Sequence, residues 1–268
     1  MLGREKAESA FNQGISLLKS GCVKDAVVCF EQALKQDPKF TKALQQRSFV
    51  LCMMGEPVRA LEDCNLAISI DPDDAWSYLH RAIVQSKLQN HRSTIEDCST
   101  ALRLDSTLLV AYTERGSAYC ELRQFDNAIA DFSKAIKLNP LDSVNYICRA
   151  VAYDEIGKYR QVISDFSKAI ELNPNDPIGY FSRGLAYHKI DNFVKALSDY
   201  DKALELQPCF DEVRQNRQIA LGQIQHHRKN SNTSTPTLRS KNARAKSAER
   251  APRAKVYDIF TKAEIASE

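Results

Sequence analysis

Small and apolar residues recur along residues 7–210 at intervals of three and four, the spacing of one face of an α-helix. The stretch 109–142 contains two such series, separated by a polar break and followed by a proline. Its landmarks are Tyr112, Gly116, Tyr119, Ala128, Phe132, Ala135 and Pro140. Two antiparallel helices approach closely only where the facing residues are small, so this stretch predicts a helix-turn-helix pair.

The same pattern of 34 residues occurs six times without a break. The copies start at Ala7, Thr41, Ala75, Leu109, Ser143 and Pro177. Proline closes five of them, as in Asp37-Pro38 and Asn139-Pro140, and its ring ends the second helix by removing a backbone donor. We therefore predict an all-α chain in which each repeat packs on its neighbours.

These landmarks resemble the tetratricopeptide repeat (TPR), a helix-turn-helix unit of the same length. The resemblance covers residues 7–210 and implies a right-handed α-solenoid of six tandem repeats with a C-terminal capping helix and a disordered tail. The implied repeats are 7–40, 41–74, 75–108, 109–142, 143–176 and 177–210.

The two ends of the chain have their own patterns. Residues 1–6 are expected to form an N-terminal flank. Residues 211–228 are predicted to be the capping helix, because Val213, Ala220 and Ile224 share one face and Asp211 can cap its start.

The tail, 229–268, is rich in Ser, Thr, Asn, Lys and Arg and is expected to be basic and disordered. A solvated linker is the favoured interpretation; a nuclear-localisation or nucleic-acid patch and phosphorylation near Ser240 and Ser247 are the alternatives. A short helix over 254–265 could dock on a partner or fold back into the chain's own groove.

Composition sets limits on the class of protein. The chain of 268 residues is 43% hydrophobic, yet no stretch is long and apolar enough to span a membrane, and the first residues are too polar for a signal peptide. Its eight cysteines contain no CxxC pair and are expected to be core residues with free thiols. A cytoplasmic, possibly nuclear, protein is expected.

Comparison of the six copies with each other reveals a covariation. Copies two to six have arginine at the seventh place and aspartate at the twenty-third, whereas copy one has Gln13 and Cys29. We predict a structural ladder of Arg–Asp pairs within the repeats, and a row of ligand-binding charges is the alternative. The residues are Arg47, Asp63, Arg81, Asp97, Arg115, Asp131, Arg149, Asp165, Arg183 and Asp199.

In the family that the chain resembles, the first helices line a concave groove that binds peptides. The matching places here are mostly apolar, which suits a helical or extended apolar segment of a partner protein, although each side chain could instead pack between helices. The candidate groove residues are Trp76, Leu79, Ile83, Val110, Thr113, Val144, Ile147, Val151, Ile178, Phe181 and Leu185.

The main alternative is a chaperone-associated adaptor, which in this family requires a clamp of Lys, Asn and Arg. The clamp places hold Phe11, Ile15, Gln46, Trp76 and His80, so this alternative is disfavoured. Nucleic-acid or nuclear association through the tail is a further alternative, although no aromatic residue interrupts the basic run before Tyr257.

The sequence contains no GxSxG, HExxH or glycine-rich phosphate loop. A non-catalytic scaffold is therefore expected, without cofactor or metal. Its partner is expected to be a protein bound in the groove, to which the tail could add contacts.

Overall fold

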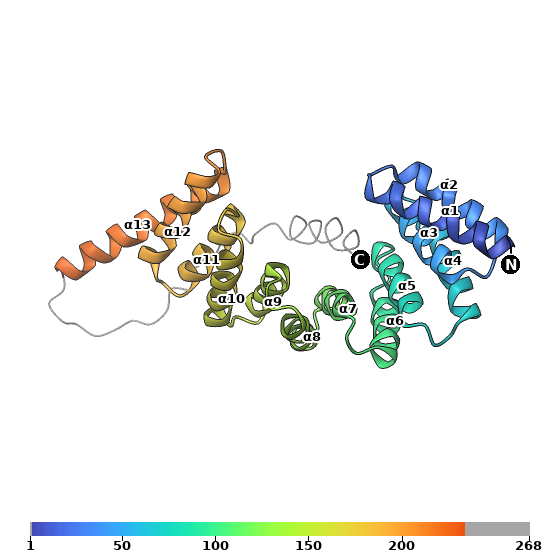
Figure 1. Ribbon diagram of the computed structural model, residues 1–268. Coiled ribbons are helices and arrows are strands. Elements are labelled where there is room, and N and C mark those ends of the chain that lie inside the picture. The colour runs from blue at the N-terminus through green and yellow to red at the C-terminus, as the bar shows by residue number, and fades with distance from the viewer. Residues whose placement is uncertain (1, 234–268) are drawn as a thin grey trace. The chain divides into compact units, whose positions relative to one another are not determined.

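The computed structural model describes residues 2–233, and within them the chain forms thirteen α-helices and no strand. The helices fall into two compact units, divided between Asn139 and Pro140. Unit 1 contains α1 to α8 and unit 2 contains α9 to α13 (Figure 1). Each unit is described by itself below.

In unit 1 the helices pair in chain order, and each pair packs on the next. The helices are α1 (Leu2–Lys19), α2 (Val23–Gln36), α3 (Thr41–Met53), α4 (Pro57–Ile70), α5 (Ala75–Lys87), α6 (His91–Leu104), α7 (Leu109–Glu121) and α8 (Phe125–Leu138). Helix α1 starts at Leu2, so most of the expected flank is helical.

In unit 2 two helix pairs are followed by a single helix. The helices are α9 (Ser143–Glu155), α10 (Tyr159–Leu172), α11 (Pro177–Lys189), α12 (Phe193–Leu206) and α13 (Asp211–Thr233). Helix α13 packs on α12 and continues five residues beyond the predicted end of the capping helix. The rest of the predicted tail, with Ser240, Ser247 and the segment 254–265, lies outside the described residues.

The two ends of each second helix have a repeated geometry. At the start, the residue at place fifteen of every copy has a positive φ, and three of these six residues are not glycine: Gln89, Arg123 and Asp191. At the end, an extended residue donates its backbone N–H to an alanine carbonyl four residues earlier, as Asn139 does to Ala135. Proline follows in five copies, and the helix cannot continue through it.

In three of the helix pairs, a glycine on the first helix faces a large aromatic ring on the second. Gly14 faces Phe30, and Gly116 faces Phe132; a Cβ atom added at Gly116 would lie 2.8 Å from Cε1 of Phe132. Both rings are fully buried. The close approach of the two helices therefore depends on the missing side chain.

Candidate functional site

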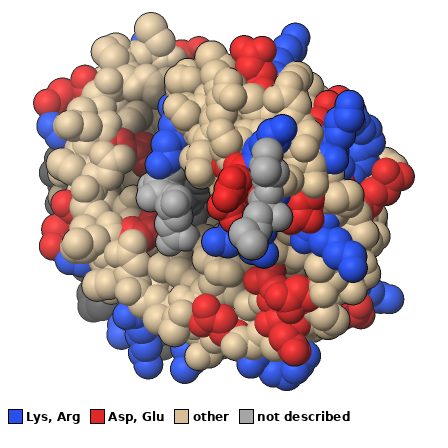
Figure 2. Space-filling model, turned by 45° about the vertical axis from the view of Figure 1, so that its right-hand side comes forward, with Lys and Arg blue, Asp and Glu red and all other residues tan. Residues whose placement is uncertain are grey.

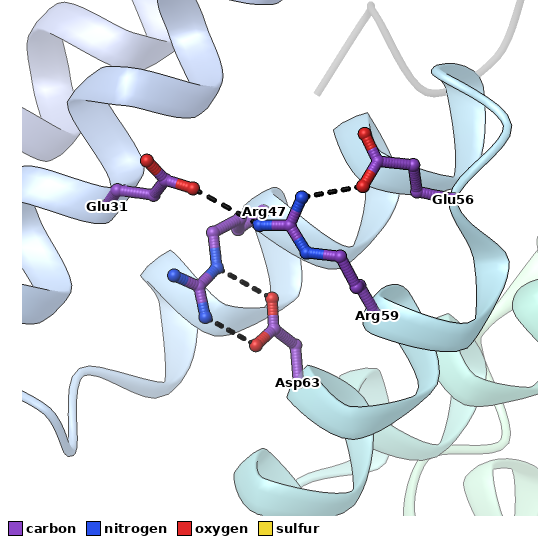
Figure 3. Close-up of polar contacts among 5 residues, drawn as sticks. All are labelled: Glu31, Arg47, Glu56, Arg59 and Asp63. Carbon is purple, nitrogen blue, oxygen red and sulfur yellow. Dashed lines mark hydrogen bonds and ion pairs between the residues drawn. The ribbon is translucent and has the colours of Figure 1, made fainter.

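The structure brings the ten predicted ladder residues together as five pairs, each joining the two helices of one repeat. Arg47 on α3 donates from Nε to Oδ2 of Asp63 on α4 at 2.8 Å and from Nη2 to Oδ1 at 2.6 Å (Figure 3). The four later pairs repeat this double contact, with distances between 2.6 and 2.9 Å. Both oxygens of each carboxylate are therefore engaged.

The third guanidinium nitrogen reaches the preceding repeat, a contact that the covariation did not predict. In unit 1, Nη1 of Arg81 donates to Asn65 Oδ1 at 2.9 Å, and Nη1 of Arg115 donates to Ser99 Oγ at 3.0 Å. In unit 2, Arg183 makes the same contact with Ser167. At these three arginines the ladder links a repeat to the one before it, in addition to joining the two helices of its own repeat.

The five arginines are partly buried, and four of them, Arg81, Arg115, Arg149 and Arg183, lie against tyrosine rings. The guanidinium of Arg115 lies 5.8 Å from the ring centroid of Tyr112, and Arg81 has the same relation to Tyr78. The hydrogen bond with Asp131 raises the pKa of Arg115 above its already high value. Few donors remain on these arginines for a ligand, which favours the structural interpretation of the ladder over a binding one.

Five of the eleven candidate groove residues lie in the core instead of on a surface. They are Leu79, Ile83, Thr113, Phe181 and Leu185, each less than a tenth exposed. Leu79 and Ile83 pack in one cluster with residues of α6 and α7, and Phe181 and Leu185 pack in another with residues of α12 and α13. The structure corrects the predicted groove here, because a side chain enclosed by neighbouring helices cannot contact a peptide without rearrangement.

The other six groove candidates retain contact with solvent. Trp76 on α5 is 40% exposed, and the remaining five are partly buried: Val110, Val144, Ile147, Val151 and Ile178. Trp76 and Val110 belong to unit 1, and the other four belong to unit 2.

In unit 1 the first helices α3, α5 and α7 pack side by side. Helical spacing places Trp76 and Lys87 on one side of α5, and Val110 and Glu114 on the corresponding side of α7. Cys52 of α3 adjoins them, since both Lys87 and Glu114 influence its pKa. We call the surface formed by these five residues the first-helix face.

Polar groups occupy the part of this face that is distant from Trp76. Burial raises the pKa of Glu114, while the nearby ammonium of Lys87 and a hydrogen bond with the Ser86 side chain act in the opposite direction. Lys87 is exposed, and no carboxylate of the described residues lies within 4 Å of its ammonium. Burial also raises the pKa of the Cys52 thiol, so this thiol is not an activated nucleophile.

His80 lies on the same side of α5, at the sixth place of its copy. It is buried, and desolvation lowers its pKa to about 4. His80 is therefore neutral at pH 7 and supplies no positive charge to a ligand carboxylate at this clamp place.

Sequence reasoning missed the polar part of the first-helix face. The sixth place of the copies reads Asn12, Gln46, His80, Glu114, Cys148 and Ser182. Polar residues occupy this place in five of the six copies, and that recurrence is the sequence signal that could have revealed Glu114.

Charges of both signs are distributed over the surface. Figure 2 shows lysine and arginine side chains interspersed with aspartate and glutamate over the face in view. Within residues 2–233 no helix is long and apolar enough to cross a membrane. Among the described residues, no three His, Cys, Asp or Glu side chains are placed to hold a metal ion.

The repeated helix pairs define an all-α helical-repeat solenoid. Models of the tetratricopeptide repeat match residues 7–40, 110–141 and 177–208, and a TPR repeat model matches 151–191. The chain belongs to the tetratricopeptide-repeat proteins, a class that binds protein partners, and it is a protein-interaction scaffold.

Solved structures of similar fold agree with this assignment. The chain is 20% identical to a chain of the APC/C hetero-tetramer Cut9-Hcn1 with a TM-score of 0.67, covering 81% of this chain and 43% of that one. PilF of Pseudomonas aeruginosa is 15% identical with a TM-score of 0.71, covering 81% and 99%. YrrB, described as a TPR protein with an unusual peptide-binding site, is 21% identical with a TM-score of 0.62, covering 70% and 97%. At these identities the likeness concerns the fold alone.

Among curated proteins, the heat shock protein sti1 homolog of Schizosaccharomyces pombe is 30% identical over 78 residues. The match covers 29% of this chain and only 13% of the relative. Most of that relative is therefore outside the comparison.

Proposed function

We propose that this scaffold binds a helical or extended apolar peptide segment of a partner protein on the first-helix face of unit 1. The observation that carries the proposal is the exposure of Trp76, a large aromatic side chain, beside Val110 on the adjacent helix. Tryptophan is enriched among the residues that dominate binding energy at protein interfaces. TPR folds serve as non-catalytic scaffolds, and the chain offers no competing catalytic motif.

The polar residues of the face can fix the orientation of such a segment. Lys87 offers N–H donors to peptide carbonyl groups, and the Glu114 carboxylate accepts hydrogen bonds from peptide N–H groups or a basic side chain. An apolar surface with a few placed polar groups is the usual composition of a specific binding site.

Unit 2 offers a second surface of the same kind. Val144, Ile147 and Val151 on α9 and Ile178 on α11 are partly exposed. We propose that these four residues of unit 2 also bind an apolar peptide segment, independently of the surface in unit 1.

A chaperone-associated adaptor is the second candidate, since the curated relative is named a heat shock protein. Against it stand the apolar Phe11 and Ile15 and the neutral His80 at clamp places. Nucleic-acid association through the tail is a weaker proposal, because the repeats carry mixed charge and no aromatic residue interrupts the basic run before Tyr257.

A cytoplasmic or nuclear location is part of the proposal. All eight cysteines are free, and the buried ones, such as Cys64 and Cys98, are core residues with raised thiol pKa values. Free thiols in this number are typical of a reducing compartment.

The proposed face is tested by affinity capture and mass spectrometry, comparing the intact chain with the double variant Trp76→Glu, Val110→Glu. The matched control is Leu141→Glu, Val194→Glu, which places the same charges at two highly exposed apolar positions elsewhere. All three proteins must have the same melting temperature, so that a loss of partners does not reflect unfolding. We expect a discrete set of partners to be lost from the face variant alone, and retention of that set would refute the proposal.

A direct measurement follows for any partner segment found in this way. Trp76 is the only tryptophan of the chain, so its fluorescence reports on this face without labelling. Binding of a peptide on the face should shift the emission of Trp76 to shorter wavelength, because the peptide shields the indole from water.

A further inference from the structure

Helix α13 adds an exposed apolar residue to the surface proposed for unit 2. Ile219 is the ninth residue of α13, as Val151 is of α9 and Leu185 is of α11. Leu185 is buried in a cluster that includes residues of α13, whereas Ile219 is 47% exposed, and no described helix follows α13 to cover it. We call the five residues Val144, Ile147, Val151, Ile178 and Ile219 the apolar surface of unit 2.

Charged side chains border this surface and leave its middle uncharged. At the border, Nζ of Lys189 lies 2.7 Å from Oδ1 of Asp154 and 2.9 Å from Oδ2, so these two charges pair with each other. Glu212 is the second residue of α13, where α9 and α11 have Val144 and Ile178. The fifth and ninth residues of the three helices carry no charge: they are Ile147, Val151, Phe181, Leu185, Gln215 and Ile219. The middle of the surface therefore suits an apolar ligand.

The chain itself contains a segment of this chemistry. Within 254–265, where the sequence predicts a short helix, Val256, Ile259, Phe260 and Ala263 have the spacing of one side of a helix. The same segment contains two lysines, one aspartate and one glutamate, so its charges sum to zero. An uncharged, apolar interaction is therefore available to it.

Part of the segment repeats a sequence with which second helices pack on first helices. The residues at 260–263 are FTKA, and those at 132–135 in α8 and at 166–169 in α10 are FSKA. In both second helices the ring and the alanine of this motif are at most 5% exposed. The segment thus has side chains that are suited to packing on first helices.

A seventh repeat on α13 would be a poor use of this segment. In α8, α10 and α12 an aspartate precedes the ring and pairs with the ladder arginine, whereas the segment has Ile259 at that position. The eighth residue of α3, α5, α7, α9 and α11 is Ser, Ala or Gly, but that of α13 is Gln218, whose side chain would obstruct the ring. An isoleucine in place of the aspartate suits the apolar surface instead.

The intervening chain has a suitable length. Residues 234–253 separate the end of α13 from the segment, and a flexible linker of 20 residues has an r.m.s. span of about 25 Å. Ile219 lies 14 residues before Thr233, which is about 21 Å back along α13. The effective concentration of a tethered ligand is highest when the linker span matches the distance to its site. The tether therefore favours docking on unit 2, to which α13 belongs.

We propose that the segment 254–265 docks as a helix on the apolar surface of unit 2 and competes there with the partner protein. Ile259 and Phe260 lie against Ile178 and Ile219, and the polar side of the helix faces solvent. A helix of 12 residues is about 18 Å long, enough to cross two neighbouring helices whose axes are about 10 Å apart. The inference rests on the proposed function of unit 2, because the segment occupies the surface assigned to the partner.

The first test compares the full chain with its double variant Ile259→Ser, Phe260→Ser. The control is Leu238→Ser, which removes an apolar residue from the linker. In NMR spectra of isoleucine methyl groups, the signals of Ile178 and Ile219 should shift in the double variant and stay unchanged in the control. Unchanged signals in the double variant would overturn the proposal.

An added peptide provides the reciprocal measurement. A synthetic peptide of residues 252–266 should return the Ile178 and Ile219 signals of the double variant to their wild-type positions. Because the peptide is not tethered, about millimolar concentrations are needed. The same peptide with serine at both substituted positions should have no effect. Equal effects of the two peptides, or no effect of the first, would contradict docking.

Two further readouts identify other occupied surfaces. The Ile178 and Ile219 signals should not change on tenfold dilution of the full chain; a change would mean that the segment docks on a second copy. The emission of Trp76 should be equal in the full chain and the double variant. A change in Trp76 emission with unchanged isoleucine signals would place the segment on the first-helix face of unit 1, and the proposal would be wrong.

Affinity capture separates this proposal from the function on which it rests. The double variant should capture about three- to tenfold more of the partners that Ile178→Glu with Ile219→Glu removes, because the surface is no longer occupied. If such partners exist and their amount does not rise, competition by the segment is refuted while the proposed function stands. If no partner depends on Ile178 and Ile219 although their signals shift, the segment docks and the proposed function of unit 2 is wrong.

Discussion

The guanidinium of Arg115 donates two hydrogen bonds to the carboxylate of Asp131, from Nε to Oδ2 and from Nη2 to Oδ1, and both are 2.8 Å long. The pair joins α7 to α8, and Nη1 of the same arginine reaches Ser99 on α6. One side chain therefore connects three helices and two repeats. Bidentate pairing of this kind is both stronger and more directional than a single ion pair.

Arg115→Ala and Asp131→Ala are each expected to lower the free energy of unfolding by about 2 kcal/mol, because each leaves a half-buried charged partner unpaired. The double variant should lose less than the sum, with a coupling of about 1 kcal/mol or more. Urea denaturation of the four proteins measures this coupling.

A control for this cycle is the pair Lys168 and Glu171, which is exposed on α10. Replacing both by alanine should leave the unfolding midpoint almost unchanged, since solvent screens exposed pairs. Strict additivity at Arg115 and Asp131 would show that the two side chains do not cooperate.

Gly116→Ala should destabilise the protein by about 1–2 kcal/mol, because the new methyl group would collide with the buried ring of Phe132. Gly222→Ala is the matched control: it also lies in a helix, and nothing lies within 4 Å of its added Cβ. That variant should gain about 0.5–1 kcal/mol from helix propensity. Thermal melts of both variants give the comparison, and equal shifts would disprove the packing argument.

His80 makes stability depend on pH. Burial lowers its pKa from 6.5 to about 4, so below pH 6.5 the unfolded chain binds a proton that the folded chain refuses. The free energy of unfolding should therefore fall as the pH decreases from 6.5 towards 4. Glu114 acts in the opposite direction near pH 4.5 and above, because its raised pKa makes the folded state bind the proton more tightly.

The contribution of His80 is isolated by comparison with His80→Gln, which introduces the residue that Gln46 provides at the same place of copy two. Between pH 7 and pH 5 the wild-type protein should lose about 2 kcal/mol more than the variant. Parallel pH profiles in urea denaturation would mean that His80 is protonated normally in the folded state.

Gln89→Gly should stabilise the third repeat by about 0.5–1 kcal/mol. Gln89 has a φ of 60°, a conformation that costs a residue with a Cβ atom but is free for glycine. The reciprocal change, Gly55→Gln at the same place of copy two, where φ is 81°, should destabilise by a similar amount. Opposite shifts in melting temperature are expected; shifts of the same sign would contradict this account.

Most of the helical architecture could be predicted from the sequence. The same spacing of small and apolar residues occurs in all six copies of 34 residues, so each copy supports the same assignment of two packed helices. The starts of α3, α5, α7, α9 and α11 coincide with the starts of the predicted copies. The partners of the ladder could also be named, since Gln13 and Cys29 depart from the pattern together in copy one. The helical flank before Ala7 and the length of α13 carry no repeated pattern, and these were the features that the sequence described least well.

The surface was far less predictable. Trp76 and Leu79 stand three residues apart on one helix and look equally apolar in the sequence, yet Trp76 meets solvent and Leu79 is enclosed by α6 and α7. Likewise, Glu114 and Lys87 lie 27 residues apart and become neighbours only because α5 packs against α7. The sequence by itself determined the repeated helix pairs, their ends and the family, since these depend on local periodicity. Only the tertiary structure decided which apolar side chains remain exposed and which charges meet, because burial and electrostatic contact depend on the helices packed on every side.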